Sequence, residues 1–195
     1  EKAVMSTLTL YSPPHSRGIR VQKLLEVFEI PHELKTVDFH AGETRTPEYL
    51  KIHPYGRVPA LLHGETTVLE SGAITLYLAD AFPAELKAPA PGTVERARLY
   101  EWLLFFQSTL EQVAVESFAA EDKSKSVEKI RELLSAMAGR FVGPYVLGEE
   151  FTMLDVILNV ELSWYRITGI YPDGLEPYES FLNRTNHRMN WPEPV

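Results

Sequence analysis

Residues 53–80, HPYGRVPALLHGETTVLESGAITLYLAD, contain the most informative pattern for the fold of this chain. Residues 60–63 and 67–70 are short runs of strand-forming residues, and the Gly64-Glu65 pair after the first run is typical of a tight hairpin turn. A serine follows at position 71, directly before apolar residues at helical spacing, which predicts the start of a helix. The stretch therefore predicts a strand, a turn, a second strand and a helix in immediate succession.

Two features of this stretch indicate binding chemistry. Pro59 begins the first strand, where a proline is tolerated because its missing N–H needs no partner. If the Val58-Pro59 bond is cis, the Val58 backbone turns outward and can pair with an extended ligand. Glu70 and Ser71 offer a carboxylate, a hydroxyl and free backbone N–H groups at a helix start, a set that suits an amino-acid zwitterion. Taken singly, each feature is also explained as an ordinary strand start or an ordinary helix cap.

The residues before this stretch predict a βαβ unit. Residues 7–11 form a first strand that Pro13-Pro14 ends, a helix runs from about 16 to 29, and residues 33–39 are a second strand. With the hairpin and the helix from Ser71, this order predicts a thioredoxin-like α/β domain over residues 1–82.

Residues 83–92 predict a linker, because proline and glycine recur in them, and residues 93–195 predict an all-α helical domain. Residues 99–106, LYEWLLFF, are apolar on nearly every side of a helix and are therefore expected to be buried on several faces. Thr152-Met153-Leu154-Asp155 is a capping box that opens a further helix. The helices are expected over 93–119, 126–141, from 153 onward and over 176–188.

Composition limits the function classes. The chain of 195 residues has a net charge of −8, which argues against a nucleic-acid surface, and no cysteine, which excludes disulfides, thiolate metal sites and a protein thiol nucleophile. The spacing of the six histidines matches no zinc motif, so we expect no metal site. Absence of a long apolar run and of a visible signal peptide predicts a cytoplasmic protein without membrane contact. Met5 is typical of a natural start, which leaves open whether residues 1–4 are native.

HPYGRVPAL followed by LESGAITLYLAD resembles the N-terminal half of cytosolic glutathione transferases, in particular the serine-type, bacterial-like members. The resemblance implies that Val58-Pro59 pairs with the cysteinyl backbone of glutathione and that Glu70 and Ser71 hold its γ-glutamyl end. It also implies that His40 contacts the glycine carboxylate, with Arg57 or Lys51 assisting. Glutathione would be a co-substrate, and no further cofactor is expected.

Glutathione chemistry needs a thiolate, and a free thiol with a pKa near 8.5 is only about 3% ionised at pH 7. One hydroxyl that donates to the sulfur supplies roughly 1.5–3 kcal/mol of preference for the charged form, so no metal or general base is required. Ser16, in PPHSRGIRV, matches the catalytic serine of the serine-type enzymes and is the predicted catalytic residue. Tyr11 at the end of the first strand is the competing candidate, and Ser12 is a third.

The resemblance further implies an apolar pocket for the second substrate, and Phe105 and Tyr165 are the candidate lining residues. It also implies a homodimer, in which the helix containing residues 99–106 takes part. The predicted reaction is attack of glutathione on small hydrophobic electrophiles. The alternatives are a glutathione-dependent isomerase, whose typical Ser-Ser-Cys stretch is missing here, and a non-catalytic binding or regulatory module of the same fold. The sequence does not identify the electrophile.

Overall fold

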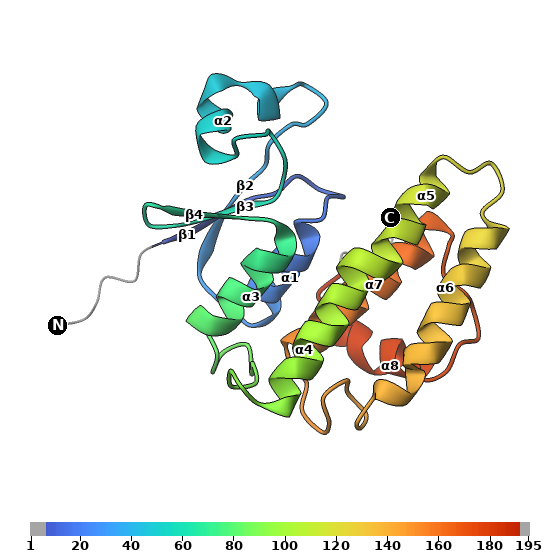
Figure 1. The fold of residues 1–195 in the computed structure, drawn as a ribbon. Helices are drawn as coiled ribbons and strands as arrows, with labels where there is room; N and C mark the ends of the chain where they lie inside the picture. The colour runs from blue at the N-terminus through green and yellow to red at the C-terminus, as the bar shows by residue number, and fades with distance from the viewer. Residues whose placement is uncertain (1–6, 192–195) are drawn as a thin grey trace. The chain divides into compact units, whose positions relative to one another are not determined.

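A four-stranded sheet with the order β2-β1-β3-β4 organises the N-terminal part of the chain, in a computed structural model that describes residues 7–191 (Figure 1). The start at Met5 and the tail that follows Trp191 therefore lie outside the described residues. The strands are β1 (Leu8–Tyr11), β2 (His32–Lys35), β3 (Ala60–His63) and β4 (Thr66–Leu69). The helices of this part are α1 (Ile19–Val27), α2 (Pro47–Ile52) and α3 (Ser71–Ala81).

The pairing of the strands is mixed. β1 pairs parallel with β2, as a βαβ unit requires, and antiparallel with β3, while β3 and β4 form an antiparallel hairpin. Figure 1 shows α1 and α3 on one face of the sheet and α2 on the other. Leu8, Leu10 and Leu61 are almost completely buried, so the sheet contributes directly to the core of this part.

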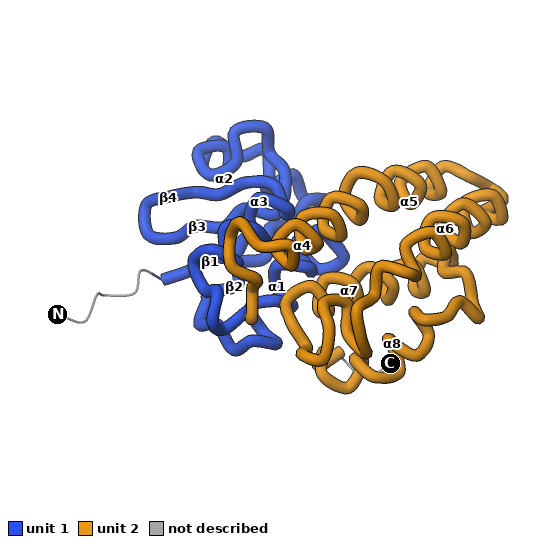
Figure 2. The backbone as a smooth tube through the Cα atoms, turned by 60° about the horizontal axis from the view of Figure 1, so that its bottom comes forward, with its two compact units in different colours: residues 1–86 blue, residues 87–195 orange. Residues whose placement is uncertain are grey.

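The chain divides into two compact units, Glu1–Leu86 and Lys87–Val195, shown in two colours in Figure 2. The division falls inside the proline-rich stretch that predicts a linker. Unit 1 contains the sheet, and the described residues of unit 2 contain helices and no strand. A thioredoxin-like unit followed by a helical unit is the fold class that the sequence predicts.

Unit 2 is built from α4 (Val94–Leu104), α5 (Glu111–Phe118), α6 (Ser124–Met137), α7 (Met153–Thr168) and α8 (Tyr178–Thr185). Short 3-10 turns follow α6 at Ala138–Arg140 and α8 at Asn186–Arg188. Helix α7 is the central one, since every residue from Met153 to Leu162 is buried.

One turn of π-helix, Phe105–Leu110, joins α4 to α5, so the long helix predicted over 93–119 is interrupted. The backbone N–H of Glu111 donates to the carbonyl of Phe106, five residues back, which is the π-type bond. The Ser108 hydroxyl donates to the Leu104 carbonyl at 2.6 Å, a side-chain to backbone bond within this turn.

Burial around this turn differs from the prediction. Trp102, Leu103 and Phe106 are buried, but Leu104 is 57% exposed. The apolar run is therefore not covered on all sides by the chain itself. An apolar sequence shows that a helix has more than one apolar face, but not which neighbours cover each face.

Several predicted element boundaries are also wrong. The strand predicted over 33–39 ends at Lys35, and the helix predicted from about Ser16 begins at Ile19 with Gly18 as its N-cap. Ser71 is the first residue of α3 and not its cap, because Glu70 occupies the N-cap position. The first and last residues of helices and strands depend on local hydrogen bonds that a periodic pattern does not specify.

The capping box predicted at the start of α7 is present. The Thr152 side chain accepts from the backbone N–H of Leu154, and the Asp155 carboxylate accepts from the backbone N–H of Thr152 at 2.8 Å. Asp155 also accepts from the backbone N–H of Val146 at 2.9 Å and therefore ties the preceding loop to the helix. These hydrogen bonds lower the pKa of Asp155, but burial of the carboxylate has the larger effect and raises the pKa to about 6.

This raised pKa predicts a pH-dependent stability. Because the folded protein holds the Asp155 proton more tightly than the unfolded chain does, the contribution of Asp155 to the free energy of unfolding should fall as the pH rises from about 4 to about 6. Asp155→Asn cannot titrate, so the stability difference between wild type and variant should shrink by up to about 3 kcal/mol across this range. Urea unfolding at several pH values measures the difference, and a constant difference would contradict the assignment.

Candidate active site

Three segments that are far apart in the sequence converge at one end of the sheet of unit 1. In the register of the sheet, Tyr11 lies opposite Ala60, and Ala60 lies opposite Leu69. The next residues are Ser12 after β1, Pro59 before β3 and Glu70 after β4. They are therefore brought to the same edge of the sheet, the one at which these strand ends meet. Strand pairing alone assembles this candidate site.

Two serine hydroxyls meet at the loop between β1 and α1. The Ser12 and Ser16 oxygens are 3.2 Å apart, within hydrogen-bond distance. Ser16 donates to the Pro13 carbonyl at 2.9 Å and accepts from the backbone N–H of Gly18 at 3.2 Å. Ser12 is 1% exposed, whereas Ser16 is half-buried, so the Ser16 hydroxyl is the more accessible of the pair.

Gly18 allows this loop to approach the start of β3. A Cβ at position 18 would lie 2.0 Å from the Ser12 oxygen and 3.2 Å from the Pro59 Cβ. Only glycine fits there without displacing the Ser12 hydroxyl or the Pro59 ring. The serine pair and Pro59 therefore lie close together, because Gly18 between them has no side chain.

The Val58-Pro59 peptide bond is cis. The preceding residue, Arg57, is exposed, and its carbonyl accepts a hydrogen bond of 2.7 Å from the Tyr49 hydroxyl on α2. The backbone that leads into β3 is therefore held from the α2 side.

Glu70 and Ser71 form the junction of β4 and α3. Glu70 has φ +67° and ψ +121°, a backbone conformation that residues other than glycine rarely adopt. The Glu70 carbonyl accepts from the Ile74 N–H at 2.9 Å and begins the helix, while its side chain is exposed. Ser71 is 7% exposed and lies in the first turn of α3.

An aromatic cluster adjoins Glu70. The Tyr55 hydroxyl donates to a carboxylate oxygen of Glu70, and the Tyr55 ring meets the His53 ring edge-on at 4.4 Å between centroids. This hydrogen bond raises the pKa of Tyr55. Burial lowers the pKa of His53, although the nearby Glu70 carboxylate opposes the effect. Tyr55 therefore stays protonated at neutral pH, and its hydroxyl can donate.

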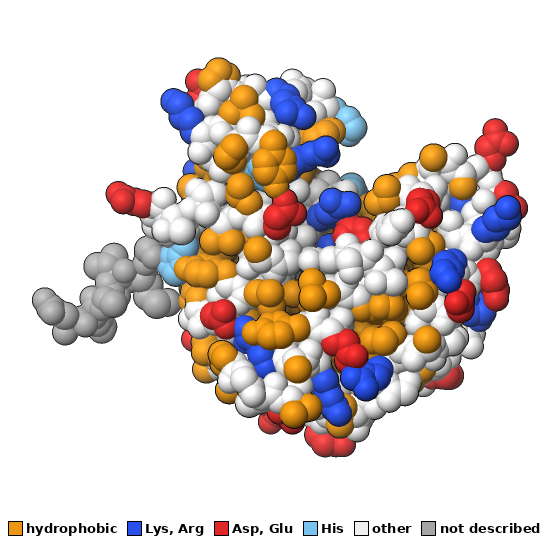
Figure 3. Space-filling model, in the orientation of Figure 1, with side chains coloured by type: hydrophobic (Ala, Val, Ile, Leu, Met, Phe, Trp, Pro, Cys, Tyr) orange, Lys and Arg blue, Asp and Glu red, His pale blue; other side chains and the backbone are white. Residues whose placement is uncertain are grey.

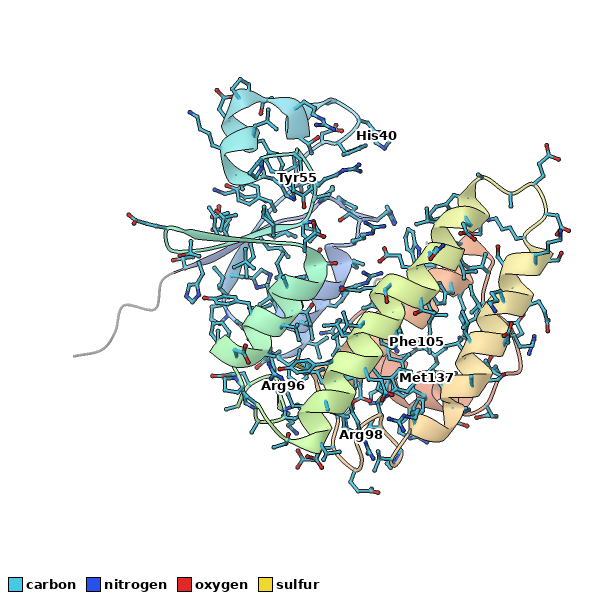
Figure 4. All side chains as sticks on the ribbon, in the orientation of Figure 1. His40, Tyr55, Arg96, Arg98, Phe105 and Met137 are labelled. Carbon is cyan, nitrogen blue, oxygen red and sulfur yellow. The ribbon has the colours of Figure 1, made fainter. Side chains whose placement is uncertain are left out.

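His40 and Lys51 are less closely associated with this cluster. Both are exposed, and the His40 ring meets the ring of its neighbour Phe39 edge-on at 6.1 Å. Figure 4 shows His40 on the loop that precedes α2, whereas Tyr55 lies between α2 and the end of the sheet. The ring contact of His40 is thus with Phe39 and not with Arg57.

Tyr11, the competitor of Ser16, packs on the α2 side of the sheet. Its ring lies 5.9 Å from the Tyr49 ring, edge-on, and 5.7 Å from the Lys35 ammonium. Side chains alternate along a strand, so Tyr11 and its neighbour Leu10 point to opposite faces of the sheet. The geometry therefore favours the serine pair, which lies beside the start of α1.

The two predicted pocket residues of unit 2 differ in exposure. Phe105 is partly exposed in the π-helical turn, with its ring 6.0 Å from Trp102 and from Phe106 (Figure 4). Tyr165 is 1% exposed on α7 and is a core residue of this structure. Of the two, Phe105 is the stronger candidate for contact with a ligand.

Residues 7–191 lack two further kinds of functional feature. No group of three or more His, Asp or Glu side chains in this range could hold a metal ion. The helices in this range are too short or too polar to cross a membrane.

Sequence reasoning missed two residues of this site. Gly18 belongs to no recognisable sequence motif, because its role is to leave space for the side chains of Ser12 and Pro59. Tyr55 precedes the first hairpin strand, and its hydroxyl contact with Glu70, 15 residues away in the sequence, follows from the hairpin register. The alternating pattern of β3 and β4 could have indicated that the turn before β3 faces the residue after β4.

Comparison with known proteins gives a consistent result. Residues 6–80 match the family model for the glutathione S-transferase N-terminal domain. Glutathione S-transferase 1 of Dianthus caryophyllus is 32% identical over 170 residues, which cover 80% of this chain and 76% of that protein.

Two solved structures have the same architecture. A glutathione transferase from Methylococcus capsulatus superimposes with a TM-score of 0.79 at 25% identity, over 93% of each chain. A glutathione transferase homologue from Sulfitobacter, solved with bound glutathione, gives a TM-score of 0.70 at 29% identity, also over 93% of each chain. Together with the fold and the converging strand ends, these similarities show that this chain belongs to the cytosolic glutathione S-transferase family of enzymes.

Proposed function

We propose that this protein binds glutathione at the sheet edge of unit 1 and activates it as a thiolate for attack on small hydrophobic electrophiles in the cytoplasm. The observation that carries the proposal is the convergence of the Ser12–Ser16 pair, Pro59 and Glu70 on one edge, supported by the family membership. A tripeptide with an ammonium, a peptide backbone and a thiol finds one group for each at that edge.

Each part of glutathione has a proposed partner. The Glu70 carboxylate pairs with the γ-glutamyl ammonium, and Ser71 with the first N–H groups of α3 receives the γ-glutamyl carboxylate. The Val58 backbone, held before Pro59, hydrogen-bonds the cysteinyl residue. Arg57 and His40 are the proposed partners of the glycine carboxylate.

Thiol activation then requires one donor at the sulfur. Ser16 has a single hydroxyl proton, which it gives to the Pro13 carbonyl in this structure. To donate to the sulfur it must turn from this carbonyl, which the Ser12 hydroxyl, also a donor to it at 3.4 Å, continues to satisfy. Ser16 is therefore the proposed donor to the thiolate, and Ser12 the group that compensates for its movement.

A hydrogen bond donated to a charged sulfur stabilises the thiolate by roughly 1.5–3 kcal/mol. Lowering the pKa of the thiol by about two units requires a stabilisation of about 2.7 kcal/mol. The hydroxyl therefore suffices for thiolate formation near neutral pH. The second substrate contributes only apolar contact in this scheme, for which Phe105 and, more weakly, Tyr165 are the proposed lining residues.

We also propose that the protein is a homodimer. Several large apolar side chains of α4 and α5 are exposed, and large exposed apolar patches are uncommon on monomers. They are Val94, Tyr100, Leu104, Val115 and Phe118. Figure 3 shows apolar side chains at the surface of the helical unit among mixed acidic and basic residues.

Removal of the Glu70 carboxylate tests the binding site. Glu70→Ala should weaken glutathione binding by about 1–3 kcal/mol, because the ligand ammonium loses a charged partner. Glu65→Ala, in the exposed turn at the other end of the hairpin, is the matched control and should bind as wild type does. Isothermal titration calorimetry measures both, and unchanged affinity in a folded Glu70→Ala variant would exclude the proposed site.

Substitution of the hydroxyls tests the chemistry. Ser16→Ala should bind glutathione nearly as wild type does, but its turnover with an aryl halide should fall about 10- to 100-fold, or about 1.4–2.7 kcal/mol in the barrier. The thiolate absorbance of bound glutathione should then titrate at a higher pH. Ser12→Ala should lose less activity, and Tyr11→Phe should lose none.

These three variants separate the candidates. Loss of turnover and a shifted titration in Ser12→Ala or in Tyr11→Phe, with normal behaviour of Ser16→Ala, assigns the role to that other residue. Glutathione binding by wild type without any conjugation or isomerisation would instead support a non-catalytic binding module.

The dimer is tested by light scattering at micromolar concentration, where the mass should be twice the 22.2-kDa chain mass. Leu104→Lys should shift the protein toward the monomer, because it places a charge among the exposed apolar residues of α4. Ile167→Lys, at a position that is 71% exposed on α7, is the control. A wild-type monomer would refute the proposed homodimer.

A further inference from the structure

We propose that Tyr55 is a positioning residue for the ammonium-binding carboxylate: its hydroxyl holds Glu70 in the orientation that receives the γ-glutamyl ammonium of glutathione. The inference rests on the proposed function, since it assigns a role within the same binding site. It concerns the direct hydrogen bond from the Tyr55 hydroxyl to Glu70 Oε1.

Tyr55 is itself fixed in place by contacts on both sides of its backbone. The Arg45 guanidinium donates to the Tyr55 carbonyl at 3.2 Å, and the Gly56 N–H donates to the His53 carbonyl at 2.8 Å. Gly56 has φ +61°, and a Cβ there would lie 2.5 Å from the Thr44 carbonyl oxygen. The turn that carries Tyr55 therefore has one tightly packed conformation.

The ring of Tyr55 has a rigid support as well. It meets the edge of His53, which is 1% exposed and stacks at 6.5 Å on Tyr49. Tyr49 in turn donates its hydroxyl to the Arg57 carbonyl. Although Tyr55 is 49% exposed, its hydroxyl is thus presented by a packed cluster and not by a free side chain.

Glu70, by contrast, needs such support. Its side chain is exposed, and ordering a free glutamate side chain costs conformational entropy. A carboxylate has about four lone-pair positions, so one oxygen can accept the Tyr55 hydroxyl while the other accepts an ammonium. Because a neutral hydroxyl leaves the negative charge of Glu70 in place, the contact orders the binding group without neutralising it. Ordering before binding increases affinity by reducing the entropy lost when the ligand binds.

The test is a comparison of Tyr55→Phe with wild type, since this change removes the hydroxyl and retains the ring against His53. The dissociation constant and the KM for glutathione should rise about three- to tenfold, the size of one net hydrogen bond. Turnover at saturating glutathione and the titration of the bound thiol should not change, because neither depends on the γ-glutamyl end.

Two further proteins make the test specific. Tyr77→Phe removes a hydroxyl that lies 2.6 Å from His63 Nδ1, away from the site, and should bind glutathione as wild type does. In a Glu70→Ala background, Tyr55→Phe should have no further effect, because the group that it positions is gone.

Each outcome is decisive. If wild type binds glutathione and Glu70→Ala weakens binding but Tyr55→Phe does not, the positioning role is refuted and the proposed function stands. Tighter binding by Tyr55→Phe would refute it too, because the tyrosine would then compete with the ligand. Equal losses in the wild-type and Glu70→Ala backgrounds would mean that Tyr55 contacts the ligand itself. Absence of glutathione binding by wild type would refute the proposed function and this inference together.

Discussion

The antiparallel register of β1, β3 and β4 is the constraint on which the candidate site depends. Tyr11 opposite Ala60 and Ala60 opposite Leu69 bring three strand ends to one edge. A slip of one residue would turn the buried leucines of β1 and β3 toward the wrong face, so burial of the core fixes the register. The same register fixes which residues leave the sheet at that edge. Stability and site assembly are therefore consequences of one pairing.

The local structure at this edge is adapted to bring backbone and hydroxyl groups close together. Gly18 leaves room for the Ser12 hydroxyl and the Pro59 ring, and Glu70 adopts a positive φ at the point where β4 becomes α3. Residues in rare backbone conformations persist where their surroundings hold them, and such positions are common at ligand sites. The chemistry proposed here needs hydroxyl donors, one carboxylate and backbone groups, all of which this edge supplies.

Unit 2 shows a similar dependence on a few polar contacts within an apolar core. Asp155 joins the Thr152 cap to the loop at Val146, and it does so at a buried position where a charge is costly. In the same unit, Ser108 accompanies the π-helical turn that carries Phe105. Irregular turns of this kind in a long helix alter the direction of the side chains that follow.

Local sequence patterns specify the order of the elements, the hairpin at β3 and β4, the helix from Ser71, the capping box of α7 and the residue types of the candidate site. These features depend on local periodicity, turn residues and caps, which neighbouring positions specify. The three-dimensional arrangement, in contrast, places Ser12 beside Ser16, requires that Gly18 lack a side chain and brings the Tyr55 hydroxyl to Glu70. It also decided that Leu104 is exposed and Tyr165 buried, although both are apolar residues on helices. The physical reason is that contacts and burial between distant positions follow from strand register and helix packing, which a one-dimensional pattern constrains without specifying.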